Sequence, residues 1–141
     1  MKKIIIIIIL IILIILIGAG GYFILNSPVA YHDGIYTAST SGAFGDTKIT
    51  LEIKDGKILK CDLEAVDKEG NIKNENYGRD SGEKNFQIAQ TALAGIKKYP
   101  ELLIEVQDVE KVDAISGATV SHREFVRLVQ EALKKSREAV K

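Results

Sequence analysis

The chain has little of what marks several large classes of protein. Among its 141 residues there are one cysteine, no tryptophan, two histidines and two prolines. One cysteine cannot form an internal disulfide, and two histidines with a single cysteine make a poor metal site. The 19 basic and 19 acidic residues balance, so the chain lacks the excess of positive charge that is typical of proteins that bind nucleic acid. The sequence therefore predicts no disulfide framework, no metal site and no nucleic-acid partner.

A long apolar run follows Lys2 and Lys3 at the start of the chain. It consists of Ile and Leu from residue 4 to residue 17 and stays apolar to residue 25. As a helix, residues 4–25 would span about 33 Å, enough to cross a hydrocarbon core of about 30 Å. We therefore expect an uncleaved transmembrane anchor in residues 1–27. A cleaved signal peptide is the alternative, but its apolar part is usually only about 7–15 residues long.

The distribution of charge predicts how this anchor is oriented. Two lysines precede it, whereas no Lys or Arg follows it before Lys48. Because Lys and Arg are enriched on the cytoplasmic side of membrane segments, we expect a single pass through the cell membrane, with a cytoplasmic N-terminus and an extracytoplasmic C-terminal domain. Cys61 lies far from the apolar run, which excludes a lipid anchor on cysteine.

After a linker at residues 28–32, residues 33–141 are enough for one domain with its own core. Ile49, Leu51 and Ile53 alternate with polar residues, and Asp55-Gly56 is a pair that two-residue hairpin turns prefer. The pattern predicts a hairpin whose return strand covers residues 58–66. A strand at 34–39, a loop at 41–46, a turn at 67–71 and an edge strand at 72–77 complete the predicted sheet. Alternation along the return strand places Cys61 in the core with Leu59, Leu63 and Ala65.

Helical spacing replaces this alternation after residue 82. Apolar residues recur at that spacing from Glu83, and Tyr99-Pro100 is expected to end the helix. Residues 109–114 are expected to form a last strand. Since the strands precede the helices rather than alternate with them, the sequence predicts an α+β fold, with an antiparallel sheet packed against two or more helices.

The most informative segment lies just before the last helix, at residues 113–122. Ser121 and Glu124 have the spacing of a capping box, with Ser121 as N-cap, and Val120 and Phe125 stand where a hydrophobic staple would form. Helix starts carry unpaired amides and partial positive charge, which favours phosphate binding. The simpler interpretation is a helix cap with no ligand.

Residues 113–121 read D-x-x-S-G-A-T-x-S, and this run resembles the flavinylation motif of the FMN-binding domain family. The resemblance implies that FMN is attached through its phosphate to Thr119 by a separate flavin transferase that uses FAD as donor. It also assigns Asp113, Ser116, Gly117 and Ala118 to the motif, with Ser121 beside the cofactor. We interpret Gly117 and Ala118 as leaving room for a large ligand. His122 is a departure, because many relatives have a small hydroxyl residue there.

The resemblance also implies a function and partners. Family members include flavin subunits of sodium-pumping and Rnf-type oxidoreductases and membrane-anchored extracytoplasmic flavoproteins. It suggests a redox carrier rather than an enzyme with its own substrate, reduced by a quinol- or NADH-linked partner in the membrane. Tyr36, Phe44 and Tyr77 are candidates to contact the isoalloxazine ring, although core packing is the simpler role for each.

Other arrangements of the same residues are less consistent with known chemistry. A second Ser-Gly-Ala begins at Ser41, but Phe44 stands where the acceptor Thr would be, and its ring is expected to pack nearby. A catalytic triad built from Asp113, Ser116 or Ser121 and His122 is not expected, because the side chains of sequence neighbours such as Ser121 and His122 diverge by about 100° around a helix. We therefore expect no catalytic residue and interpret both histidines, His32 and His122, as solvated. Noncovalent FMN binding and a membrane-tethered module without cofactor remain alternatives, and visible absorbance before and after denaturation distinguishes the three.

Overall fold

An antiparallel hairpin lies at the centre of the domain. The structure, a computed structural model, describes residues 31–139, so the anchor expected at residues 1–27 lies outside the described residues. Strand β2 (Gly45–Lys54) turns into β3 (Lys57–Ala65) through Asp55 and Gly56, whose φ angles are 52° and 71°. Positive φ at both turn residues is what a type I′ hairpin requires. The predicted hairpin and its turn are confirmed.

Strand β1 (Gly34–Gly42) pairs with the other side of β2, which gives an antiparallel sheet in the order β1-β2-β3. The loop expected at 41–46 is a tight turn of two residues, because Gly42 pairs directly with Gly45. Phe44 in this turn is 70% exposed, so the expectation that its ring packs nearby is wrong.

The edge strand expected at residues 72–77 is also wrong. A single bridge joins Val66 and Ile72, and the chain turns again at Tyr77, whose N–H donates to the Asn74 carbonyl. The turn at residues 67–71 does form, since the Asp67 carboxylate accepts hydrogen bonds from two backbone N–H groups inside it.

Helix α2 (Glu83–Val106) follows the short 3-10 helix η1 (Arg79–Ser81) and continues through Pro100, which was expected to end it. Proline removes one backbone hydrogen bond, but the buried face of the helix extends beyond it to Leu103, which is fully buried. Tertiary packing therefore outweighs the local helix-breaking signal. The strand expected at 109–114 is wrong as well: η2 (Val109–Lys111) is a 3-10 turn, capped by the Asp108 carboxylate.

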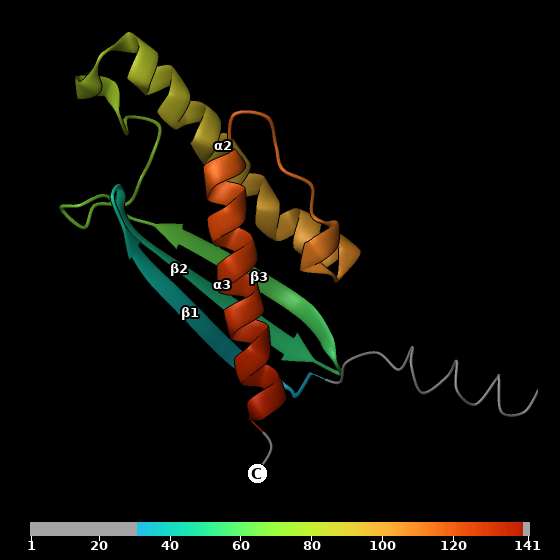
Figure 1. The fold of residues 1–141 in the computed structure, drawn as a ribbon. Helices are drawn as coiled ribbons and strands as arrows, with labels where there is room; N and C mark the ends of the chain where they lie inside the picture. Colours follow the sequence, from blue (N-terminus) through green and yellow to red (C-terminus); the bar gives the residue numbers. More distant parts are fainter. Residues whose placement is uncertain (1–30, 140–141) are drawn as a thin grey trace, which may run out of the picture. The chain divides into compact units, whose positions relative to one another are not determined.

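Helix α3 (Thr119–Glu138) and α2 lie on the same face of the sheet (Figure 1). α3 packs against β1 and β2, and α2 packs against β3. The two helices and the sheet enclose one core, whose largest fully buried side chains include Ile49, Leu51, Tyr99, Phe125 and Leu128. The opposite face of β2 is polar and mostly exposed. The predicted α+β class is confirmed, with three strands and two long helices among the described residues.

A β-bulge in β3 changes which of its side chains face the core. The pairing with β2 shifts between Glu52 and Ile53, so Ile58 is buried and Leu59 is 52% exposed. Cys61 is buried as expected. Next to the bulge, Gln107 accepts a hydrogen bond from Ile58 N at 2.8 Å and donates to Ile58 O at 2.9 Å, which fixes the C-terminal end of α2 to the sheet.

Candidate functional site

The motif predicted from the sequence, residues 113–122, connects η2 to α3. Val112 before it and Ala118 within it are buried, whereas the backbone between them passes over the surface. Residues Ile115–Ala118 form a β-turn, called here the motif turn, closed by a 2.9 Å hydrogen bond from Ala118 N to Ile115 O. Gly117 is its third residue and has φ 80°, a backbone conformation that favours glycine.

A buried tyrosine of α2 holds both ends of the motif turn. The hydroxyl of Tyr99 donates to Ala118 O and accepts from Ile115 N, each at 3.1 Å. Tyr99 is fully buried and its ring stacks on Phe125 of α3, with centroids 5.4 Å apart. Sequence reasoning placed Tyr99 only at the end of a helix, because nothing local to it indicates a contact with residues 16 to 19 positions away.

Packing against α2 explains the small residues of the motif turn. A Cβ added at Gly117 would lie 2.5 Å from Thr91 Cγ2, and one added at Gly95 of α2 would lie 2.4 Å from Ala118 Cβ. Ala118 is only 1% exposed, so its methyl group fills the interface between the helices. The interpretation that Ala118 leaves room for a ligand is therefore wrong, and Gly117 has a packing reason for its size.

Helix α3 begins three residues earlier than expected. Thr119 is its first residue and Ala118 its N-cap, with no side-chain capping bond, and the helical pattern starts with His122 N donating to Ala118 O at 2.9 Å. Ser121 is therefore inside the first turn rather than the N-cap, and the predicted capping box is wrong. Val120 is 69% exposed, which also rules out the staple with Phe125.

The early start leaves three backbone donors at the helix end. The N–H groups of Thr119, Val120 and Ser121 have no hydrogen-bond partner among residues 31–139. Such unpaired amides, together with the positive end of the helix dipole, form the usual binding site for a phosphate group. The side chain of Thr119 is exposed beside them.

The remaining predicted motif side chains are also at the surface. Asp113 and Ser116 are exposed and Ser121 is half-buried, and none of the three side chains forms a hydrogen bond within the described range. The motif residues thus divide into two groups. Gly117 and Ala118 are fixed by packing, whereas the polar side chains are open to a ligand or a partner protein.

His122 does not behave as expected. It is half-buried rather than solvated, its Nε2 atom lies 2.6 Å from the carbonyl of Val112, and its ring is 5.4 Å from that of Tyr99. Since a carbonyl can only accept, Nε2 must carry the proton and donate. The imidazole therefore holds the chain that enters the motif. His32 is exposed, as expected.

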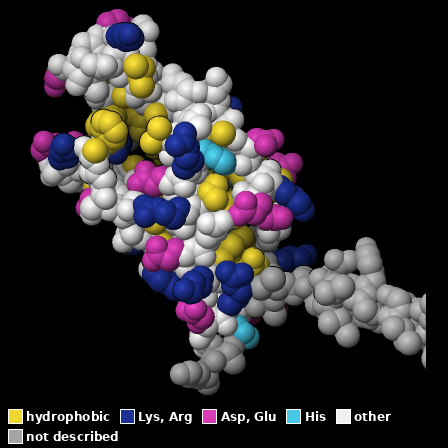
Figure 2. Space-filling model, in the orientation of Figure 1, with side chains coloured by type: hydrophobic (Ala, Val, Ile, Leu, Met, Phe, Trp, Pro, Cys, Tyr) yellow, Lys and Arg dark blue, Asp and Glu magenta, His cyan; other side chains and the backbone are white. Residues whose placement is uncertain are grey.

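Several large apolar side chains of the domain are exposed, and one of them, Val120, is at the start of α3. Val120, Phe44 and Ile72 are 69%, 70% and 64% exposed, and Figure 2 shows hydrophobic side chains gathered near the start of α3. Lys73 Nζ lies 5.2 Å from the centre of the half-buried Tyr77 ring. Burial lowers the pKa of Lys73 and raises the pKa of Tyr77. Tyr36 lies apart in β1, with its hydroxyl 3.3 Å from Asp33 O.

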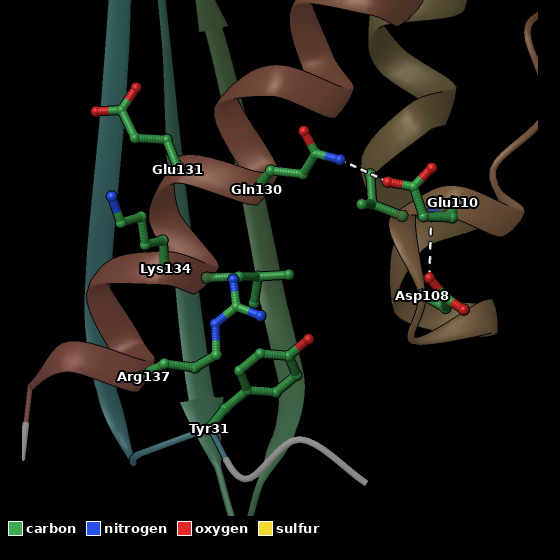
Figure 3. Close-up of a pocket in the computed structure, with 9 residues that line it drawn as sticks. Tyr31, Asp108, Glu110, Gln130, Glu131, Lys134 and Arg137 are labelled. Carbon is green, nitrogen blue, oxygen red and sulfur yellow. Dashed lines mark hydrogen bonds between the residues drawn. The ribbon is translucent and has the colours of Figure 1, made fainter. Parts of the chain in front are cut away.

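Two hollows on the described surface differ in their relation to the motif. The one that reaches the motif has a volume of about 400 Å³ and lies between Gly117 and α2; its other lining residues are Lys84, Gln87, Ile88 and Thr91. The larger, about 470 Å³, lies along the second half of α3 and η2, and no motif residue lines it. Figure 3 shows that Gln130 on its wall donates to Glu110 and that charged side chains of both signs surround it. The motif, not the larger hollow, identifies the site.

The described residues contain no cluster of His, Cys, Asp and Glu suited to a metal ion. Within the same range no helix is both long and apolar enough to cross a membrane.

The fold and the motif together define a small α+β domain that presents a threonine at an open helix start. Comparison with known proteins identifies its family: residues 42–134 match the FMN-binding domain, and the chain belongs to that family. The expected family is confirmed, and FMN is the cofactor associated with this domain. No curated protein matches the chain.

Two solved structures are similar to this chain. The crystal structure of CPE2226 protein from Clostridium perfringens has a TM-score of 0.63 and 24% identity, covering 77% of this chain and 91% of that one, and it supports the fold. A solution NMR structure of a protein from Clostridium thermocellum has 26% identity and a TM-score of 0.44, covering 73% of this chain and 90% of its own.

The residues at the motif fit an FMN group. The phosphate of FMN carries negative charge, which the three unpaired amides at the start of α3 can bind. The isoalloxazine ring is flat and largely apolar, and exposed apolar side chains, among them Val120, lie at the same helix start. Both halves of the cofactor thus have suitable surface within reach of Thr119.

Proposed function

We propose that this protein is an electron carrier in which FMN is covalently attached to Thr119 through its phosphate. The observation that carries the proposal is the position of Thr119, which is exposed as the first residue of α3 within a complete flavinylation motif. A free hydroxyl beside three unpaired amides suits a phosphoester, because the same amides that bind the phosphate in a noncovalent complex stay bound to it after attachment.

The attachment needs a separate flavin transferase that uses FAD. The Thr119 hydroxyl attacks the phosphate on the FMN side of the FAD pyrophosphate, its proton is lost, and AMP leaves, so the products are FMN-threonine and AMP. Asp113 is exposed two residues before the motif turn, where its carboxylate can contact that enzyme and orient the motif. Within residues 31–139, no side chain is hydrogen-bonded to the Thr119 hydroxyl.

The test is to produce the full chain with and without a flavin transferase, and to measure intact mass and in-gel flavin fluorescence after denaturation. We expect the wild type to gain the mass of FMN less one water, and Thr119→Ala to gain nothing. Ser116→Ala should reduce the modification less. Thr91→Ala is the matched control, because it removes another exposed threonine hydroxyl next to Gly117, and it should be modified like the wild type. Flavin that persists on Thr119→Ala would refute the assignment.

Noncovalent FMN binding is the second candidate, favoured by the same open amides. It predicts a yellow protein that loses all its flavin on denaturation. A tether is the more economical arrangement for a domain outside the cell, because it keeps the effective concentration of the cofactor high even where the surface contacts are modest.

The bound flavin would supply the redox chemistry, and the polypeptide would hold and present it. We propose that residues 1–27 anchor the chain in the cell membrane with the domain outside, and that a quinol- or NADH-linked membrane oxidoreductase reduces it. Protease added to intact cells should then digest the domain. Menaquinol analogues or partner flavoproteins, added without oxygen, should bleach the flavin absorbance. If none of these donors reduced the flavin, the proposed partners would have to be abandoned.

A further inference from the structure

The geometry points to Tyr99 as a positioning residue for flavin attachment: its buried hydroxyl holds the motif turn in the conformation that presents Thr119 to the transferase. This inference rests on the proposed attachment at Thr119. Tyr99 lies outside the motif and on another helix, so no pattern in the motif itself indicates the role.

The hydrogen bonds of Tyr99 span the whole motif turn. The hydroxyl accepts from Ile115 N at one end and donates to Ala118 O at the other, each at 3.1 Å. Ala118 O also accepts from His122 N, the first hydrogen bond of α3. The Tyr99 hydroxyl therefore fixes the position of the motif turn relative to the start of α3. Thr119 is the residue at which the turn ends and the helix begins.

The surroundings of Tyr99 favour a fixed rather than a mobile hydroxyl. The side chain is fully buried, and its ring packs against Phe125 on one side and His122 on another. Gly95, one helical turn before Tyr99 on α2, lets the backbone of the motif approach closely enough for both bonds to form. In contrast, the side chains of Asp113, Ala114 and Ser116 are exposed. Among the described residues, Tyr99 is the only one whose side chain forms hydrogen bonds to the backbone of residues 113–118.

The substitution Tyr99→Phe removes only the hydroxyl oxygen and keeps the buried ring. We expect the variant to fold, and the motif turn to sample additional conformations. When only a fraction of the acceptor is competent, its apparent affinity falls by that fraction. We therefore expect the KM of the transferase for the full chain to rise about five- to thirtyfold, with kcat nearly unchanged. This is the factor by which the loss of one or two hydrogen bonds shifts the equilibrium between the competent conformation of the motif turn and other conformations.

Hydrogen exchange of the unmodified chain supplies a second readout that needs no flavin. The Ile115 amide donates to Tyr99 in the wild type, so its exchange should accelerate in Tyr99→Phe, while exchange in β2 stays unchanged. Tyr31→Phe is the matched control, because it removes a tyrosine hydroxyl on the wall of the larger hollow, which no motif residue lines. It should match the wild type in both assays.

The outcomes separate the two proposals. A wild type that the transferase does not modify refutes attachment at Thr119, while the exchange data still report whether Tyr99 orders the turn. If the wild type is modified and Tyr99→Phe shows the same KM, the positioning role is refuted, whatever its exchange. A purely structural role would lower the urea midpoint in Tyr99→Phe without changing KM at a temperature where the chain is fully folded, and that result also overturns the inference.

Discussion

At Gly95, α2 lies in close contact with Ala118 of the motif, and we predict that Gly95→Ala destabilises the domain. A Cβ there would lie 2.4 Å from Ala118 Cβ, whereas real Cβ contacts are essentially never closer than 3.0 Å. Both atoms are fixed to backbone, so no change of rotamer relieves the contact. Overpacking of this kind costs about 1–3 kcal/mol, while Gly→Ala in a helix interior gains about 1 kcal/mol. The overlap should outweigh the gain, with a net loss of up to about 2 kcal/mol.

Equilibrium unfolding in urea measures this directly, as a lower midpoint at constant slope. Two further variants separate the cost of the overlap from the gain in helix propensity. Ala94→Gly, at the exposed neighbouring position of α2, reports helix propensity alone, and it should cost about 1 kcal/mol. The double variant Gly95→Ala/Ala118→Gly moves the methyl group from one helix to the other, so it should recover most of the loss. Glycine is acceptable at the N-cap that Ala118 occupies.

One result would refute the reasoning outright. If Gly95→Ala raised the midpoint, as helix propensity alone requires, the close approach of the two helices would be wrong. A double variant no more stable than the single one would show that the loss comes from somewhere other than Ala118.

Two more predictions concern the core and the sheet edge. Burial raises the pKa of Cys61 from 9.0 to about 12, so a thiol reagent at pH 8 should react only after unfolding, and fast labelling of the folded chain would contradict the burial. The stability that this thiol contributes is present below pH 9 and is lost as the pH rises toward 12. Cys61→Ala should not show this loss. Gln107→Ala removes the hydrogen bonds to Ile58 N and Ile58 O and should lower the free energy of unfolding in urea by about 1–3 kcal/mol. Gln107→Glu keeps an acceptor but no donor, so it should not restore the wild-type midpoint. Equal midpoints for the wild type and both variants would show that this contact is not needed.

The features that the sequence predicted well are those with local causes. The β2–β3 hairpin follows from alternation and from Asp55-Gly56, and the register of β2 follows from the same alternation. Pro100 shows the limit of local signals, because the buried residues beyond it keep α2 helical. The bulge beside Leu59 is another case: it changes which residue faces the core, and a linear pattern of alternation cannot show where pairing shifts.

The prediction of where α3 begins was wrong for a related reason. Ser121 and Glu124 have the spacing of a capping box. The chain is already helical at Thr119, directly after the motif turn, so Ser121 lies inside the helix and cannot be its N-cap. The contacts that determine this come from Tyr99 and His122, one distant in sequence and the other interpreted as solvated. Long-range hydrogen bonds leave no periodic trace in a sequence, so the residue types of the motif were predicted and their supports were not.

The structure also separates the two physical demands on the motif. Gly117 and Ala118 contact α2 so closely that packing alone accounts for their size, and a domain that bound no cofactor would need them equally. Asp113, Ser116 and Thr119 are different, because their side chains are exposed and form no hydrogen bonds within residues 31–139. Stability therefore gives no reason for a carboxylate and two hydroxyls at these positions. The proposed attachment of FMN by a transferase would give all three side chains a function.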